Sequence, residues 1–200
     1  MSRILQRVFV VTMALCLVLG SFSPVFADKQ ARPVAAPNVV TATILHTNDF
    51  HGNLEPAGSN PGAARVAQVI EDVRFDPTAG TVVLVDGGDI MQGSLLSNLF
   101  HGESTIDIYN SMGYQVATFG NHEFDWGQTV LAERVAEASF PFVSANIVKN
   151  DTGDCATAGW TAPDWATPWT TVTVGAGADT AEIGFIGVTS QETPYITIAS

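Results

Sequence analysis

Positive charge is scarce in this sequence of 200 residues. Eight lysine and arginine residues stand against 20 acidic ones, which gives a formal net charge of −12 at pH 7 with histidine neutral. Such a surface repels the phosphates of nucleic acids, and no cluster of basic residues interrupts it. We therefore exclude nucleic acid as a partner. The acid excess serves either solubility outside the cell or cation binding, and the spacing of individual residues has to decide between these roles.

A long apolar run is also missing. The run at residues 8–19 has only 12 residues, whereas about 20 are needed to cross the hydrocarbon core of a membrane. It follows Arg3 and Arg7 and precedes a short segment ending at Ala27, which is the arrangement of a cleavable signal peptide. We therefore predict a signal peptide at residues 1–27, cleavage after Ala27, and a secreted, periplasmic or cell-envelope protein without a stable membrane span.

Cysteine is the third shortage. Removal of the signal peptide leaves Cys155 alone, so its thiol is either free or lacks its partner here. The remaining chain has six basic and 20 acidic residues, a formal charge of −14. Hydrophobic residues make up 46% of the sequence, too large a share for a disordered chain. We expect a flexible leader at residues 28–38, which include Pro33 and Pro37, and one folded domain at residues 39–200.

Short apolar segments alternate with segments of helical periodicity. A helix is indicated around residues 66–73, where four apolar side chains recur at the spacing of one helix face. Strands are expected at residues 40–46, 81–85, 116–119, 142–148, 170–174 and 181–188, and further helices at residues 104–112 and 128–138. Strands separated by helices imply right-handed crossovers and a largely parallel sheet. The last two strands have the spacing of a hairpin.

Two helices allow finer predictions. Ser104 is placed to cap the helix at residues 104–112. The helix at residues 128–138 turns Leu131 and Val135 toward the core and Arg134 toward solvent.

Polar clusters follow the first three strands, where each strand ends. Asp49 and His51 come after the first strand, Asp89 after the second behind two glycines, and Asn121 with His122 after the third. In parallel sheets, sites gather beyond the carboxyl ends of the strands. Each cluster alone is typical of an ordinary turn. Together they offer the carboxylate, amide and imidazole groups that bind divalent cations, with His122 available to a substrate instead of a metal.

Other candidate residues have a plainer explanation. His46 is expected to pack or form a hydrogen bond within its strand near the site, and His101 to lie on the surface. Trp160, Trp165 and Trp169 fall in an irregular stretch that is predicted to be a surface insertion. Local packing is favoured for these tryptophans over a binding role, which stays open.

Three runs of the sequence resemble one family. ILHTNDFHGNL (44–54), VDGGDIMQGS (85–94) and GNHEFD (120–125) resemble the calcineurin-like metallophosphoesterases, in particular the secreted branch of 5′-nucleotidases, UDP-sugar hydrolases and cyclic-nucleotide phosphodiesterases. FPFVSANIV (140–148) and IGFIGVTSQETP (183–194) are similar to that branch as well. Order and spacing match the family throughout. Phe119 departs from it, because an aliphatic residue usually precedes GNHEFD in the branch.

The resemblance implies a fold and a metal site. The fold is an α/β one, a four-layer α/β/β/α sandwich that is incomplete at the C-terminus of this chain. The site holds two divalent metal ions, of which manganese, zinc, cobalt and iron all suit the ligands. Carried over by position, Asp49 and His51 bind the first ion, Asp89 bridges both, and Asn121 binds the second.

The resemblance also implies a catalytic pair. His122 would be the catalytic histidine, supported by Asp125, and as an imidazolium it would stabilise the transferring phosphoryl group or the leaving oxygen. The family completes its metal sites with later histidines and binds substrate through a C-terminal domain, yet this sequence has no histidine after His122. We therefore expect residues 39–200 to be the N-terminal portion of a longer enzyme, and the fragment to be inactive or very weak alone.

The expected function is hydrolysis of phosphate esters of extracellular nucleotides, as in 5′-nucleotidases. Alternatives within the family are a cyclic-nucleotide phosphodiesterase or a nucleotide-sugar hydrolase. An alternative of another class is a non-catalytic binding or scaffold protein with the same fold. The full set of expected metal and catalytic residues favours the enzyme, whose partner would be a small phosphoester substrate.

Overall fold

The computed structural model describes residues 39–150 and 159–197 of the chain. The predicted signal peptide and leader lie outside these residues, and so does Cys155. Among the described residues, no helix combines the length and the apolar character that a membrane span requires.

The centre of the fold is a parallel sheet of four strands. The strands are β1 (Ala42–Thr47), β2 (Thr81–Asp86), β3 (Val116–Thr118) and β4 (Phe142–Val143). They lie in sequence order and each pairs with the next in parallel. The α/β class and the parallel sheet are thus confirmed.

The predicted fourth strand, residues 142–148, is too long. It ends at Val143 because the backbone then forms hydrogen bonds outside the sheet: Ser144 N donates to Thr167 O at 2.8 Å, and Ala145 N donates to Gly187 O at 2.8 Å. The segment therefore leaves β3 and continues as a loop.

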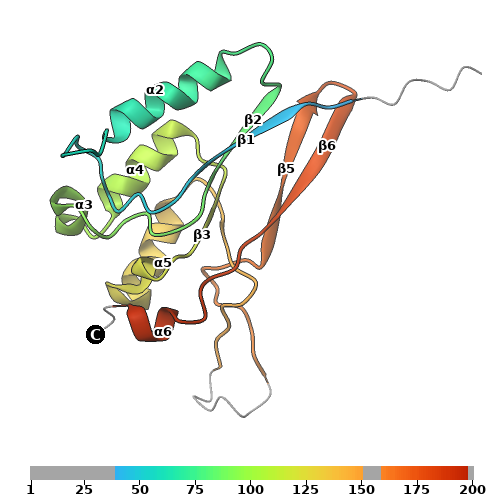
Figure 1. The fold of residues 1–200 in the computed structure, drawn as a ribbon. Helices are drawn as coiled ribbons and strands as arrows, with labels where there is room; N and C mark the ends of the chain where they lie inside the picture. The colour runs from blue at the N-terminus through green and yellow to red at the C-terminus, as the bar shows by residue number, and fades with distance from the viewer. Residues whose placement is uncertain (1–38, 151–158, 198–200) are drawn as a thin grey trace, which may run out of the picture. The chain divides into compact units, whose positions relative to one another are not determined.

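Three helices of ten or more residues lie between consecutive strands of the sheet. They are α2 (Ala63–Arg74), α4 (Glu103–Met112) and α5 (Gly127–Glu137). Strands in sequence order joined by right-handed crossovers place all connecting helices on one face of the sheet. Figure 1 shows these helices on one side of the strands and the hairpin of β5 (Trp169–Ala176) and β6 (Asp179–Ile186) on the other. Of the expected α/β/β/α order, the described residues thus form the helical layer, the parallel sheet and the hairpin.

The hairpin confirms the last two predicted strands. β5 and β6 pair antiparallel over their whole length. The hairpin is joined to the parallel sheet by the backbone N–H of Gly175, which donates to Thr81 Oγ1 at 2.9 Å. Val174 on β5 is buried as well. The second sheet of the expected sandwich is represented by these two strands in the described residues.

The core lies between the helices and the parallel sheet. Leu84, Ile106 and Tyr109 have no exposed surface, and the ring of Tyr109 stacks on that of Tyr114 with centroids 4.0 Å apart. Burial of large apolar side chains between these layers is the main stabilising contribution to such a fold.

Two expectations about helices are wrong. α4 begins at Glu103 after Gly102, whose φ of 86° only glycine adopts readily, and the hydroxyl of Ser104 is buried without a hydrogen bond instead of capping the helix. Arg134 on α5 is buried, with its guanidinium donating to Glu137 and to the carbonyl of Phe100. These acceptors and the carboxylate of Glu133, 3.6 Å from Nη2, compensate its charge, although Nε is buried without a hydrogen bond.

Candidate functional site

Loops at the carboxyl ends of the first three strands form the candidate site. We call them the β1 loop (48–52), the β2 loop (87–92) and the β3 loop (120–125), which contains the 3₁₀ helix η1 (His122–Phe124). The pairing of β1 with β2 continues into the loops through backbone hydrogen bonds: Asp49 N to Gly88 O at 3.0 Å, His51 N to Asp89 O at 2.9 Å and Gly52 N to Ile90 O at 2.8 Å. The first two loops are therefore held together along their length.

Three of the predicted site residues have a strained backbone. The φ angles of Asp49, His51 and Asp89 are 53°, 51° and 56°. These values lie in the left-handed region, which residues other than glycine rarely adopt. Such residues cost on the order of 1–3 kcal/mol each and persist where the surrounding hydrogen bonds determine them. The loop bonds described above provide that support. Strain of this kind clusters at functional sites.

The side chains of the three loops converge. One ligand atom each from His51, Asp89 and His122 lies within 4.8 Å of the others. The two imidazole rings meet edge to face with centroids 5.0 Å apart. Asp49 adjoins this group, because its Oδ1 lies 3.9 Å from Nε2 of His51. Four predicted residues therefore lie together, and two imidazoles with a carboxylate are a set of donors that suits a transition-metal ion.

Hydrogen bonds orient both imidazoles. Nδ1 of His51 donates to the carbonyl of Gln92 at 2.8 Å, and Nδ1 of His122 lies 2.7 Å from Oδ2 of Asp125. Since a carbonyl can only accept, Nδ1 of His51 has the proton, and Nε2 is left for a ligand. Metal-binding histidines commonly have this arrangement.

Asp125 favours the charged form of His122. Partial burial lowers the pKa of the His122 imidazole, but the hydrogen bond and negative charge of Asp125, with the charges of Asp89 and Glu123, outweigh burial and hold that pKa above its usual value. Asp125 is itself buried, and its other oxygen accepts a hydrogen bond from Thr197 Oγ1 at 2.9 Å. The carboxylate that orients the imidazole is thus itself held on its other side, and an imidazolium oriented in this way can serve as a proton donor.

Asn121 forms a hydrogen bond outside the three loops. It lies in the β3 loop beside His122, but its Nδ2 donates to the carbonyl of Ile196 at 3.3 Å, in the short helix α6 (Thr193–Ile196). The nitrogen end of the amide is thus directed to α6. The oxygen end is the part of the amide that suits a cation.

Glu123, for which the sequence pattern predicts no role, is 1% exposed and lies between two of the loops. Its carboxylate accepts three backbone hydrogen bonds, from Asp89 N at 2.8 Å, Ile90 N at 2.7 Å and Gly120 N at 2.7 Å. Burial raises the pKa of the Glu123 carboxyl to about 7, although the three N–H groups lower it. Its place within GNHEFD is the one sign of importance in the sequence.

Asp86 is a second buried acid without an assigned role. It ends β2, and its carboxylate accepts hydrogen bonds from Thr47 Oγ1 at 2.5 Å, Gly88 N at 2.7 Å and the hydroxyl of Tyr109 at 3.0 Å. Burial raises its pKa to about 6 against these donors. Asp86 therefore ties the start of the β2 loop to β1 and to the core, and the acid-rich run VDGGD was the available signal.

The other candidate residues agree in part with their predictions. His101 is exposed and lies edge to face with the ring of Trp126. His46, which was expected to pack or form a hydrogen bond within its strand near the site, lies in β1 and is also exposed. Trp165 packs against the core with its ring 5.3 Å from that of Phe119, whereas Trp160 and Trp169 are exposed.

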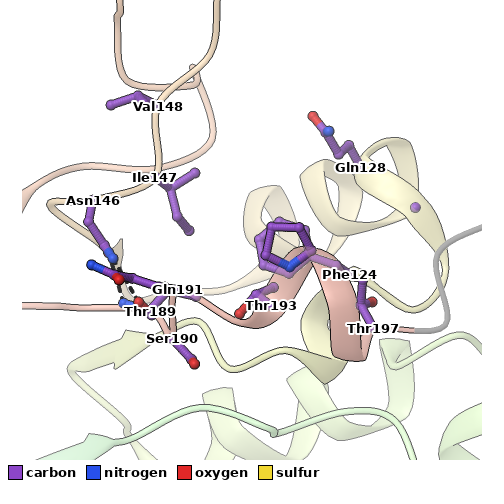
Figure 2. Close-up of a pocket in the computed structure, with 12 residues that line it drawn as sticks. Phe124, Gln128, Asn146, Ile147, Val148, Thr189, Ser190, Gln191, Thr193 and Thr197 are labelled. Atoms are coloured by element: carbon purple, nitrogen blue, oxygen red, sulfur yellow. Dashed lines mark hydrogen bonds between the residues drawn. The ribbon is translucent and has the colours of Figure 1, made fainter. Parts of the chain in front are cut away.

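A cavity of about 620 Å³ lies beside the β3 loop (Figure 2). Phe124 lines it between Thr197 on one side and Asn146 with Thr189 on the other, and Asn146 Nδ2 donates to the carbonyl of Thr189 at 2.7 Å. None of its lining residues is charged. The cavity adjoins the pair His122 and Asp125 through Thr197, which donates a hydrogen bond to Asp125, but its lining does not include the His51–Asp89–His122 cluster.

Comparisons with known proteins give a consistent result. The sequence model of the calcineurin-like phosphoesterases matches residues 42–177. The chain is 33% identical over 166 residues to a snake venom 5′-nucleotidase of Gloydius brevicauda, covering 78% of this chain and 26% of that protein. It is 37% identical over 131 residues to Protein UshA of Escherichia coli K12, covering 64% and 24% of the two.

Solved structures have the same fold. A 5′-nucleotidase precursor from Thermus thermophilus superposes with a TM-score of 0.64 at 30% identity, over 80% of this chain and 30% of the other. The chain thus spans less than a third of the length of these relatives. The matched residues include all three loops of the candidate site.

Proposed function

The chain belongs to the calcineurin-like phosphoesterase family, and we propose that it provides the metal site for hydrolysis of phosphate esters of extracellular nucleotides, as a 5′-nucleotidase does. The observation that supports this most is the convergence of His51, Asp89 and His122 within 4.8 Å at the ends of adjacent parallel strands. The 5′-nucleotidase relatives point to nucleotides as the substrate class.

The donor set fits two divalent ions. We propose that Asp49 and His51 bind the first ion, that Asp89 bridges both, and that Asn121 binds the second through its amide oxygen. Carboxylate, imidazole and amide ligands suit manganese, zinc, cobalt or iron. When bound, two such cations lower the pKa of water and balance charge on the phosphoryl oxygens.

His122 and Asp125 are proposed as the catalytic pair. Asp125 favours the protonated imidazole and bonds its Nδ1, which leaves Nε2 free to face a substrate. Nε2 of His122 can then donate a proton to the leaving oxygen or stabilise the phosphoryl group as its charge develops. The buried carboxylate of Asp125 remains in place because Thr197 bonds its second oxygen.

The protein is proposed to act outside the cytoplasm. An arrangement typical of a signal peptide opens the sequence, one relative is named as a venom protein, and the related solved structure is named as a precursor. We also propose that the 200-residue chain is weak or inactive alone, because it has no histidine after His122 to complete the metal site.

Metal binding and phosphate release test this function together. The purified chain would be titrated with Mn²⁺ and Zn²⁺ and then assayed with AMP, a cyclic nucleotide and a nucleotide sugar. We expect metal binding that His51→Ala and Asp89→Asn abolish, with little or no turnover. His46→Ala, at an exposed histidine on β1, is the matched control. Absence of metal binding would refute the proposed function, and AMP turnover above about 1 s⁻¹, in the range of whole enzymes, would refute the expected weakness of the chain.

A further inference from the structure

Glu123 joins the two loops that contain most of the candidate site. One of its oxygens, Oε2, accepts from Asp89 N in the β2 loop and from Gly120 N in the β3 loop, and the other, Oε1, accepts from Ile90 N. A single buried carboxylate thus satisfies three backbone donors from two loops. Both oxygens face these amides, so Glu123 is placed to hold the loops and is not itself a metal ligand.

The two loops approach each other so closely that side chains are excluded between them. A Cβ added at Gly88 would lie 2.4 Å from the backbone nitrogen of Gly120, and one added at Gly120 would lie 2.1 Å from Oδ1 of Asp89. The same Oδ1 accepts a hydrogen bond from the backbone N–H of His122 at 2.9 Å. The position of the Asp89 carboxylate therefore depends on how the β3 loop is seated against the β2 loop.

Removal of the Glu123 carboxylate would leave the backbone N–H groups of Asp89, Ile90 and Gly120 without this acceptor. Each buried N–H group without a partner costs about 1–3 kcal/mol. The loops could relieve this only by moving apart or admitting water. Either change would move the β3 loop, with Asn121 and His122, away from Asp89, whereas Asp49 and His51 would stay beside Asp89 through the backbone bonds between the β1 and β2 loops.

We propose that Glu123 is a positioning residue that fixes Asp89 against the β3 loop and thereby determines binding of the second metal ion. The part of this inference that concerns metal binding rests on the proposed function. The part that concerns the contact between the loops does not. Selective weakening of the second ion would distinguish Glu123 from a residue needed only for folding, because a general loss of stability would weaken binding of both ions alike.

The first experiment uses the metal-free chain. Glu123→Gln keeps the size of the side chain but replaces one accepting oxygen with an N–H donor. We expect amide hydrogen exchange, measured by NMR, to become about tenfold faster at Asp89, Ile90 and Gly120, with exchange at Leu84 in β2 unchanged. Glu55→Gln, at an exposed glutamate, makes the same change in charge as a control. Unchanged exchange at the three amides would overturn the proposal whether or not the chain binds metal.

The second experiment counts the metal ions. Mn²⁺ titration followed by electron paramagnetic resonance separates a single ion from a magnetically coupled pair. We expect Glu123→Gln to weaken the second ion by about 10–100-fold, a typical effect of losing a group that orients a metal ligand, and to leave the first ion near its original affinity. Equal weakening of both ions, or of neither, would overturn the proposal. A parent chain that binds no Mn²⁺ would overturn the proposed function instead, and the exchange experiment would then decide the role of Glu123.

A further variant separates charge from position. Glu123→Asp keeps the negative charge but shortens the side chain by one methylene, and it serves also if the glutamine variant does not fold. If position matters, this variant weakens the second ion and speeds exchange at Gly120. If it behaves as the parent chain in both measurements, charge alone suffices and the positioning role is wrong.

Discussion

Nδ1 of His122 lies 2.7 Å from Oδ2 of Asp125, and this contact raises the proton affinity of an imidazole in the centre of the candidate site. Burial by itself would lower the pKa of His122, so the carboxylate reverses the direction of the shift. We expect Asp125→Asn to bring that pKa to or below its usual value of about 6.5.

An NMR titration of the His122 ring in the metal-free chain would measure the change. Asp164→Asn, at an exposed carboxylate, is the control and is expected to leave the titration unchanged. A pKa of His122 that does not fall in Asp125→Asn would show that the pair does not act as described. Because the folded-state pKa is raised, the contact stabilises the fold below about pH 6.5 and loses this effect as pH rises through the folded-state pKa.

Metal binding is expected to stabilise the fold. A ligand at 100 times its dissociation constant that binds only the folded state adds about 2.7 kcal/mol, which for a chain of this size raises the Tm by roughly 5–10 °C. Differential scanning fluorimetry with Mn²⁺, followed by excess chelator, would measure this shift and its reversal. His51→Ala should remove it and His46→Ala should retain it. The idea fails if both variants respond to Mn²⁺ as the parent chain does.

The sequence predicted the site better than it predicted the helices and loops around it. Asp49, His51, Asp89 and His122 could be placed together because the carboxyl ends of parallel strands meet at one edge of a sheet. That argument needs only the order of the strands. The order of the strands does not predict the direction of a side chain. The hydrogen bond between the amide of Asn121 and α6 could therefore not be predicted.

Other features depend on contacts between distant residues. The short helices α3 (Leu95–Leu99) and α6 contain too few residues for a periodic pattern and were not predicted. Glu123 and Arg134 are charged residues that the sequence favours on the surface, yet each is buried because it meets polar partners from other segments. Such partners lie about 30 residues away or more in the chain and leave no local pattern.

Because the β2 and β3 loops are in close contact, we expect any larger residue at Gly120 to disturb them. Its Cβ would lie 2.1 Å from Oδ1 of Asp89, so Gly120→Ala must displace the carboxylate or the loop. We expect a loss of about 1–3 kcal/mol in the free energy of unfolding, measured by urea denaturation, together with weaker Mn²⁺ binding. Gly184→Ala, where a Cβ meets open space on β6, is the control and should stay within about 0.5 kcal/mol of the parent chain. Equal effects of the two substitutions would contradict the contact.

Trp165 is expected to act through packing. Its ring lies edge to face with Phe119 and Phe124, with centroids 5.3 Å and 6.0 Å away. Trp165→Ala should therefore lower the free energy of unfolding by about 3 kcal/mol, the order expected when a large aromatic side chain is removed from a core. Trp160→Ala removes an exposed ring and should change it by less than about 0.5 kcal/mol. Chemical denaturation decides the point, and a stability loss in the Trp160 variant as large as that in the Trp165 variant would contradict it.

The buried carboxyl of Asp86 predicts a particular dependence of stability on pH. Burial raises its pKa from 3.8 to about 6, so between these values the folded chain binds more protons than the unfolded chain. The contribution of Asp86 to the free energy of unfolding then falls as pH rises through this window, by about 3 kcal/mol in all. Asp86→Asn cannot ionise, while its oxygen can still accept from Gly88 N and its amide can donate to the Tyr109 hydroxyl.

We therefore expect Asp86→Asn to gain stability relative to the parent chain between pH 4 and pH 6, in urea denaturation at several pH values. Asp76→Asn gives a comparison of opposite sign, because hydrogen bonds from Thr78 lower the pKa of Asp76. Its charge favours the folded chain above about pH 4 and loses that effect as pH falls through the folded-state pKa, so its replacement should be relatively more harmful at higher pH. A difference between Asp86→Asn and the parent that does not vary with pH would show that Asp86 is not held in its neutral form by burial.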